Sequence, residues 1–142
     1  MRRITQADRV HYELMAKQFD DWNVLKKSID NTSSLVGFSQ REIWWCRIGI
    51  NVGFEEDGKS QQFSRPVLVL RKFNKHFFLG IPLTTSVKRN NPYHHVFTFQ
   101  EQEISALLSQ TRPYDAKRLT DRIGQVPEQT FAETREAFKR ML

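Results

Sequence analysis

Hydrophobic and polar residues form their clearest pattern in the middle of the chain. Two mostly apolar runs, residues 66–70 and 77–83, flank a polar pair at 74–75. The β-branched and aromatic residues of these runs favour extended strands, and the polar break favours a reversal of the chain. We therefore predict an antiparallel hairpin whose outer ends bring Arg65 close to residues 84–86.

The amino-terminal segment has the periodicity of a helix. Residues 5–30 contain neither glycine nor proline, and they begin with a threonine that can cap a helix. Apolar residues recur there at helical spacing: Phe19, Trp22, Leu25 and Ile29. We predict one long helix, or two helices separated near residues 20–21. The apolar stripe packs either on the rest of this chain or on a second protein.

Alternating residues predict further strands. Residues 42–50 form one strand, in which Trp44 and Trp45 point to opposite faces, so neither face is plainly exposed. We expect one face to contact the core and the other a dimer partner. Shorter strands are predicted at 93–99, 104–109 and 120–124. A helix near Pro127 closes the chain. Its apolar stripe consists of Phe131, Ala132, Arg135, Phe138 and Met141 or Leu142.

Two polar segments divide the chain. Residues 31–40 contain serines and a glycine and are typical of a linker, which predicts a helical extension at 1–40 and a domain at 41–142. Residues 49–63 are rich in glycine and acidic side chains. They predict a flexible loop or an irregular hairpin. We expect it to move over Arg65 and residues 84–86, which we interpret as the functional site.

Composition narrows the class of protein. A chain of 142 residues with 39% hydrophobic and 12% aromatic residues suffices for one compact domain and an appendage. The net charge of +6 fits a polyanionic partner, although a basic surface is often only solvated. The single cysteine excludes an intramolecular disulfide network and favours a reducing compartment. We find neither a secretory signal nor an apolar run that crosses a bilayer, so we expect a cytoplasmic location and no membrane partner.

The cysteine and the paired histidines carry little evidence of chemistry. Cys46 has no activating histidine at a recognisable spacing, so we interpret it as a small buried apolar residue. His94 and His95 are adjacent in a predicted strand and therefore point to opposite faces. They do not readily share one metal ion, and we interpret both as structural.

Five motifs resemble, in the same order, those of the MazF/PemK toxin family, the ribonuclease toxins of toxin–antitoxin pairs. They are EIWW at 42–45, Gly53-x-Glu55, Arg65-Pro66 before VLVL, Pro82-Leu83-Thr84, and SQTRPYDAKRL at 109–119. The resemblance spans residues 41–142. It implies a mainly β fold with α, namely an SH3-like small barrel of antiparallel strands with a C-terminal helix, preceded here by the helical extension.

The resemblance also implies an activity and partners. Members of the family are homodimeric endoribonucleases that cleave single-stranded RNA such as mRNA, need no metal or other cofactor, and are neutralised by a cognate antitoxin. Arg65 and Thr84 fall on the catalytic arginine and threonine of the family, and residues 53–58 fall on its mobile loop. We expect Gln110, Arg112 and Lys117 to bind substrate, since amides and cations bind bases and phosphates. The other expected substrate-binding residues are Gly53, Glu55, Lys59, Thr85 and Ser86.

The residues agree with such chemistry. RNA carries its own nucleophile, the 2′-hydroxyl, so the protein need only orient the backbone and stabilise a charged phosphorane. The guanidinium of Arg65 presents a fixed fork of donors to phosphate oxygens, and Pro66 restrains the backbone of Arg65. Thr84 can donate to the same oxygens or to the leaving 5′-oxygen. The expected products carry a 2′,3′-cyclic phosphate and a 5′-hydroxyl.

One departure from the family leaves the proton acceptor open. The PemK branch has an arginine and an aspartate where this chain has Leu107 and Ser109. Arg65 and Thr84 suffice alone, or Asp115 or a histidine assists them. Arg118 either binds substrate or forms an ion pair with Asp115.

Two other functions fit the same barrel. A CcdB-like toxin binds a protein target such as gyrase and does not need the pair of Arg65 and Thr84. A non-catalytic RNA-binding module of SH3-like fold retains RNA without cutting it. The extension at 1–40 pads the dimer, occupies the antitoxin groove or shapes the RNA channel, and the sequence does not decide among these roles.

Overall fold

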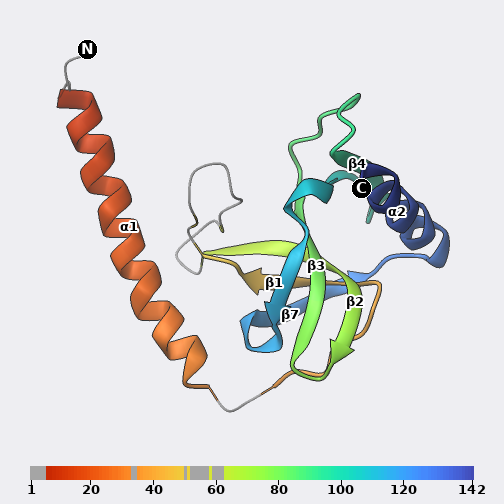
Figure 1. Ribbon diagram of the computed structural model, residues 1–142, viewed down its shortest axis with the longest axis horizontal. Helices are drawn as coiled ribbons and strands as arrows, with labels where there is room; N and C mark the ends of the chain where they lie inside the picture. The colour runs from red at the N-terminus through yellow and green to blue at the C-terminus, as the bar shows by residue number, and fades with distance from the viewer. Residues whose placement is uncertain (1–5, 33–34, 50, 52–57, 59–62) are drawn as a thin grey trace.

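The structure is a computed structural model that describes residues 6–32, 35–49, 51, 58 and 63–142, with only the backbone for 6–17. Within these residues the helices are α1 (Gln6–Asp30) and α2 (Glu128–Met141), with short 3-10 helices η1 (Leu108–Gln110) and η2 (Ala116–Arg118). The strands are β1 (Glu42–Arg47), β2 (Ser64–Asn74), β3 (Phe77–Thr84), β4 (His94–Phe99), β5 (Gln102–Leu107), β6 (Arg112–Asp115) and β7 (Leu119–Gln125). Figure 1 shows α1 and α2 on opposite sides of the curled sheet.

The strands form an antiparallel sheet that bends where β3 changes partner. Neighbouring strands follow the order β4-β5-β3-β2-β1-β7, and β6 is added to β3. The pairing of β3 with β2 extends to Pro82 opposite Val67, after which Leu83 and Thr84 pair with β5. Proline has no N–H group to donate, so it is found where a ladder of strand hydrogen bonds ends. This change of partner gives the sheet its barrel-like curl and agrees with the expected mainly β fold.

Residues 67–70 of β2 are buried on both faces of the sheet, as their unbroken apolar run indicates. Leu68 and Leu70 face one hydrophobic cluster, which α2 covers through Phe131 and Ala137. Val67 and Val69 face a second cluster on the other side. The remaining buried members of the second cluster are Phe38, Trp44, Cys46, Ile48, Phe78, Tyr114, Ala116 and Leu119. A strand packed on both faces is a rigid support for the residues at its end.

Several predicted elements are observed. The central hairpin forms from β2 and β3 as expected. A single uninterrupted helix forms the amino-terminal segment, so the alternative of two helices is wrong. The strand predicted at 42–50 ends at Arg47, and Gly49 has the positive φ of 81° that ends an extended path. Trp44 is 6% exposed and Trp45 is 42% exposed.

Two predictions need correction. The predicted strands left out residues 112–115, which form β6 through pairing with β3. A short segment with an arginine, a proline and an aspartate has little strand propensity of its own, and the neighbouring strand supplies its hydrogen bonds. In α2, Ala132 and Arg135 are exposed, and the buried stripe contains Thr134 and Ala137 instead.

The apolar stripe of α1 packs on this chain only in the last turns of the helix. Trp22 and Ile29 are buried in a third small cluster with Phe63, and Leu25 packs against it. Phe19 is 40% exposed. The extension is therefore attached to the barrel near the beginning of β2, and it is not joined to the two larger clusters.

We expect Gly80→Ala to destabilise the fold. Gly80 is a buried residue of β3, and an added Cβ would lie 2.5 Å from Val67 Cγ1 and 2.9 Å from Phe78 Cε2. Overpacking of this kind costs about 1–3 kcal/mol, which denaturant unfolding measures. Gly37→Ala is the control, because nothing lies within 4 Å of its added Cβ. Equal unfolding midpoints for the two variants would contradict the packing described here.

Candidate functional site

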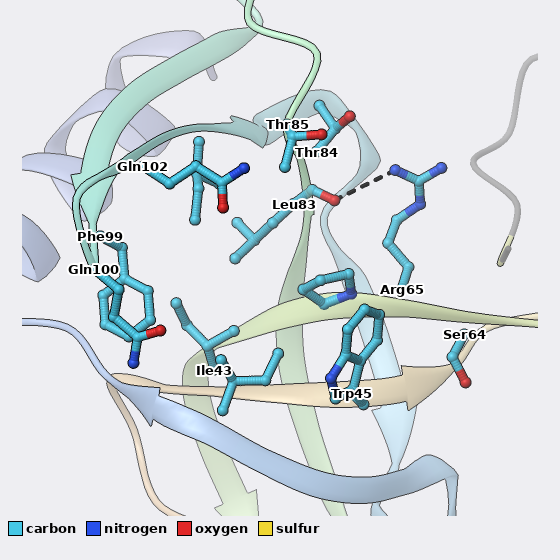
Figure 2. A pocket seen from close by; sticks show the side chains of 13 residues that line it. Ile43, Trp45, Ser64, Arg65, Leu83, Thr84, Thr85, Phe99, Gln100 and Gln102 are labelled. Atoms are coloured by element: carbon cyan, nitrogen blue, oxygen red, sulfur yellow. Dashed lines mark hydrogen bonds between the residues drawn. The ribbon is translucent and has the colours of Figure 1, made fainter.

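Arg65 is a buried cation at the beginning of β2. The residue lies opposite Cys46 of β1 and is 6% exposed. Its Nη1 donates a hydrogen bond of 3.3 Å to the carbonyl oxygen of Leu83, as Figure 2 shows. A buried charge is costly unless it is hydrogen-bonded, so this bond supports the guanidinium in its position.

Thr84 follows immediately after the carbonyl that Arg65 binds. It is the last residue of β3, and its Oγ1 accepts a hydrogen bond of 3.2 Å from the backbone N–H of Ser86. This local turn orients the threonine hydroxyl at the end of the strand. The sequence predicted that the outer ends of the hairpin meet, and the structure brings Arg65 to the end of β3 that carries Thr84.

A cavity of about 350 Å³ contains both side chains in its wall. Arg65, Thr84 and Thr85 lie at one end, and Phe99 and Gln100 lie at the other (Figure 2). The rest of the wall is mostly apolar and includes Ile43, Trp45, Ser64, Pro66, Leu83, Gln102, Ile104 and Ile123. Among the residues that the structure describes, this wall contains no carboxylate and no imidazole. The cavity therefore combines one cation and several hydroxyl and amide groups with an apolar surface.

A second cavity of about 390 Å³ contains two other predicted residues. Gln110 and Arg112 line it together with Pro82, the residue before Leu83. Its other lining residues are Asn51, Ser109, Thr111 and Tyr114. Because Pro82 and Leu83 are consecutive, the two cavities lie at neighbouring positions along β3.

Positive charge is concentrated near Tyr114, which lines the second cavity. Burial raises the pKa of Tyr114, while the charges of Arg112, Arg118 and Arg65 act to lower it. The guanidinium of Arg112 lies 4.9 Å from the centre of the Tyr114 ring. Arg112 thus lies on the ring of a buried phenol that also feels the charges of Arg118 and Arg65, which makes this region attractive to an anion.

Lys117 does not join these residues. Its Nζ donates a hydrogen bond of 3.0 Å to the carbonyl oxygen of Asp30 at the end of α1. It lines a separate cavity between α1 and η2. Arg118 donates to the carbonyl oxygen of Arg47 at 3.0 Å, and Asp115 accepts a hydrogen bond from the backbone of Lys117 at 2.9 Å. No Arg118–Asp115 ion pair is found among the described residues, although the charge of Asp115 acts on Arg118.

The remaining predicted substrate-binding residues are only partly placed. Ser86 is exposed beside Thr84 and contributes its backbone N–H to the threonine turn. Gly53, Glu55 and Lys59 lie outside the described residues, as does most of the predicted movable loop at 49–63.

The candidate bases lie away from the cavity of Arg65. His94 Nδ1 lies 3.1 Å from Ser105 Oγ, and the His95 ring stacks on Phe97. Burial lowers the pKa of His95, which borders a separate cavity against α2. Asp115 caps η2. None of these residues lines the cavity that contains Arg65 and Thr84.

Sequence reasoning missed Gln100 and Gln102, whose amides line the same cavity. Gln100 has a positive φ of 50°, as does Glu101 at 64°, in the turn between β4 and β5. Neither residue is an asparagine or glycine, so the sequence carries no turn signal at this point. Only the pairing of β5 with β3 brings these amides to the cavity.

Metal ligands and membrane-spanning helices were searched for in the same part of the chain. No three histidine, cysteine, aspartate or glutamate side chains among the described residues gather closely enough to hold a metal ion. None of the helices in the described residues is both long and apolar enough to cross a membrane.

The fold has been solved in other proteins. The Mycobacterium tuberculosis toxin MazF-mt6 is 18% identical, with a TM-score of 0.54 over 71% of this chain and 95% of that chain. An endoribonuclease solved with its cognate antitoxin, from a mycobacterial species, is 13% identical, with a TM-score of 0.55 over 74% and 94%. The MazE–MazF structure (Form-II) from Deinococcus radiodurans gives 16% identity and a TM-score of 0.57 over 77% and 96%. Comparison with curated proteins gives no significant match.

Fold and site define a small antiparallel barrel protein with an arginine and a threonine in the wall of one cavity. The sequence profile described as PemK-like, MazF-like toxin of type II toxin–antitoxin system matches residues 39–142. The chain therefore belongs to this family of toxins. The match confirms the resemblance inferred from the sequence motifs.

We expect Cys46 to be unreactive in the folded protein. The residue is 0% exposed, and burial raises the pKa of its thiol to about 12. The thiolate is the reactive form, and at pH 8 only about one thiol in 10⁴ is ionised at such a pKa. A chromogenic disulfide reagent should therefore label Cys46 only after denaturant unfolds the chain. Complete labelling of the native protein within minutes would contradict this burial.

Proposed function

We propose that this toxin is an endoribonuclease that cleaves single-stranded RNA without a metal ion. One observation carries the proposal. The bond from Arg65 to the carbonyl of Leu83 holds a guanidinium beside Thr84 in the wall of one cavity. Membership of the toxin family supports the same activity.

The proposed reaction needs only a nucleophile that RNA itself supplies. The 2′-oxygen of a ribose attacks the adjacent phosphorus, and the bond from phosphorus to the 5′-oxygen breaks. Arg65 binds the non-bridging oxygens, whose charge grows in the phosphorane. The Thr84 hydroxyl donates a hydrogen bond to the same oxygens or to the departing 5′-oxygen. The proton of the 2′-hydroxyl passes to water, and the departing 5′-oxygen takes up a proton from water. The products are a 2′,3′-cyclic phosphate and a 5′-hydroxyl.

The cavity walls suit the nucleotides beside the cleaved bond. Single-stranded RNA is recognised largely through unstacked bases that lie on aromatic rings and bond to amides. Trp45, Phe99, Gln100 and Gln102 offer both kinds of group in the cavity of Arg65. Gln110 and Arg112 in the second cavity serve the neighbouring phosphate or base, as do Thr85 and Ser86. Lys117 is excluded from this proposed set because it bonds to α1.

We also propose the partners that the family implies. The toxin is neutralised by a cognate antitoxin and acts as a homodimer in the cytoplasm. A solved structure of the same fold is described as an endoribonuclease with its cognate antitoxin, which supports the first of these partners. The indole of Trp45 is 42% exposed, which supports a contact of this surface with a second copy of the chain.

Arg65→Ala should abolish most of the cleavage. Removal of one preorganised donor to a developing oxyanion lowers kcat by about 10²–10³-fold. The assay follows a long single-stranded RNA in excess EDTA and maps the cut ends. Arg65→Lys should also be impaired, because an ammonium lacks the planar fork of a guanidinium. Arg71→Ala is the matched control, since Arg71 is an exposed arginine on the same strand.

The same assay separates the competing functions. RNA that is bound but left intact would support a non-catalytic RNA-binding module. A protein that neither binds nor cuts RNA would support a toxin with a protein target. Cleavage that survives in Arg65→Ala would refute the assignment of that residue.

Thr84→Val should lower the cleavage rate by about 10²-fold or more, because it removes a hydroxyl donor and leaves the side-chain volume nearly unchanged. Thr84→Ser keeps the hydroxyl and should retain most of the activity. Thr98→Val, at an exposed threonine of β4, is the control for a general effect of the substitution. Similar rates for Thr84→Val and Thr84→Ser would remove the hydroxyl from the mechanism.

A further inference from the structure

We infer that Trp22, in the helical extension, is a positioning residue for Arg65. The inference rests on the proposed function, and it assigns the extension a part in shaping the cleavage site. Trp22 is 6% exposed although it belongs to a helix outside the barrel. The beginning of β2, where Arg65 lies, is on the side of the barrel that faces α1 (Figure 1).

The indole of Trp22 lies directly on the backbone of Gly49. A Cβ added at Gly49 would lie 2.1 Å from Trp22 Cε2, so only a glycine leaves room for the ring. Trp22 also contacts Phe63, with 5.7 Å between the ring centres. One side chain of α1 thus contacts both Gly49, two residues after the end of β1, and Phe63, the residue before β2.

Gly49 and Phe63 are themselves bonded to each other. The N–H of Gly49 donates to the carbonyl oxygen of Phe63 at 3.0 Å, and the N–H of Gly58 donates to the carbonyl oxygen of Gly49 at 2.6 Å. A Cβ at Gly58 would lie 1.7 Å from the carbonyl oxygen of Phe63. These three residues form a closely packed backbone crossing, which we call the neck. Only Ser64 separates the neck from Arg65.

The 3-10 helix η2 anchors α1 over the neck. Lys117 Nζ donates to the carbonyl oxygen of Asp30, at the helix end where a positive charge is favourable. Arg118 donates to the carbonyl oxygen of Arg47, and its guanidinium lies 5.8 Å from the ring centre of Trp22. The helix is therefore bonded to the barrel on the side of β1, and Trp22 lies near both Arg118 and the neck.

Phe63 connects this packing to the site. Its φ of 52° lies in the left-handed region, which a bulky residue adopts only when its surroundings hold it there. Trp22 packs on its ring and Gly49 bonds to its carbonyl. Without the indole, the backbone at Phe63 can relax, and the next residues carry that change to Arg65 and its bond with Leu83. A displacement of about 1 Å is enough to lower a catalytic rate about a hundredfold.

The test compares Trp22→Ala, Trp22→Phe and Val24→Ala in the full chain. Val24 is the matched control, because it lies on the same helix and is 70% exposed. Trp22→Ala should lower kcat by about tenfold to a hundredfold with KM within about twofold of the wild type, since Arg65 acts mainly in the transition state. Trp22→Phe retains an aromatic ring on the neck and should recover most of the activity. Val24→Ala should behave as the wild type.

A second measurement does not depend on cleavage. The Nε–H signal of Arg65 in a ¹⁵N NMR spectrum, identified by its loss in Arg65→Lys, should shift in Trp22→Ala and stay in place in Val24→Ala. If Trp22→Ala does not fold, Trp22→Leu takes its place, because leucine keeps the burial but cannot cover Gly49.

The outcomes distinguish the two proposals. An unmoved Arg65 signal in the alanine or leucine variant overturns the positioning role, whatever happens to kcat. A shifted signal together with wild-type kcat and KM also overturns it. A wild-type protein that leaves RNA intact defeats the proposed function, while the NMR signal still decides whether Trp22 positions Arg65.

Discussion

The hydrogen bond between Arg65 and the carbonyl of Leu83 is the contact on which the rest of the site depends. It joins β2 and β3 beyond their last paired residues, Val67 and Pro82, at the point where β3 leaves β2 for β5. The sheet bend thus presents a carbonyl to a buried guanidinium that needs an acceptor. Because charged hydrogen bonds in a low-dielectric setting are strong, this bond contributes both to the bend and to the position of the cation.

The architecture separates rigid support from adjustable parts. Strand β2 is packed on both faces, so the position of Arg65 along the sheet is determined by two hydrophobic clusters. The path into β2 is held differently, by Trp22 of α1 on the backbone crossing of Gly49 and Phe63. The core therefore determines the position of Arg65 along the sheet. In the positioning role inferred for Trp22, the extension determines the path of the backbone into β2.

Much of the fold was predictable because it follows from local pattern. The central hairpin has continuous apolar runs, α1 has apolar residues at helical spacing, and five motifs in the same order led to the family. The pattern failed at β6, where Arg112–Asp115 has little propensity and pairs only because β3 offers an edge. It failed also for Gln100 and Gln102, whose turn lacks glycine or asparagine. Lys117 looked like a substrate group, yet it bonds to the end of α1, since a charge says nothing of its acceptor.

The sequence by itself determined the class of the chain, its mainly β character and the arginine and threonine proposed for catalysis. These depend on residue type and on the order of short motifs along the chain, which are properties of the sequence itself. Tertiary structure alone decided which side chains share a cavity and what the amino-terminal helix touches. Those relations join residues far apart in the chain, such as Asp30 with Lys117 and Trp22 with Gly49 and Phe63. They arise from packing and strand pairing in three dimensions, for which neither periodicity nor composition carries a signal.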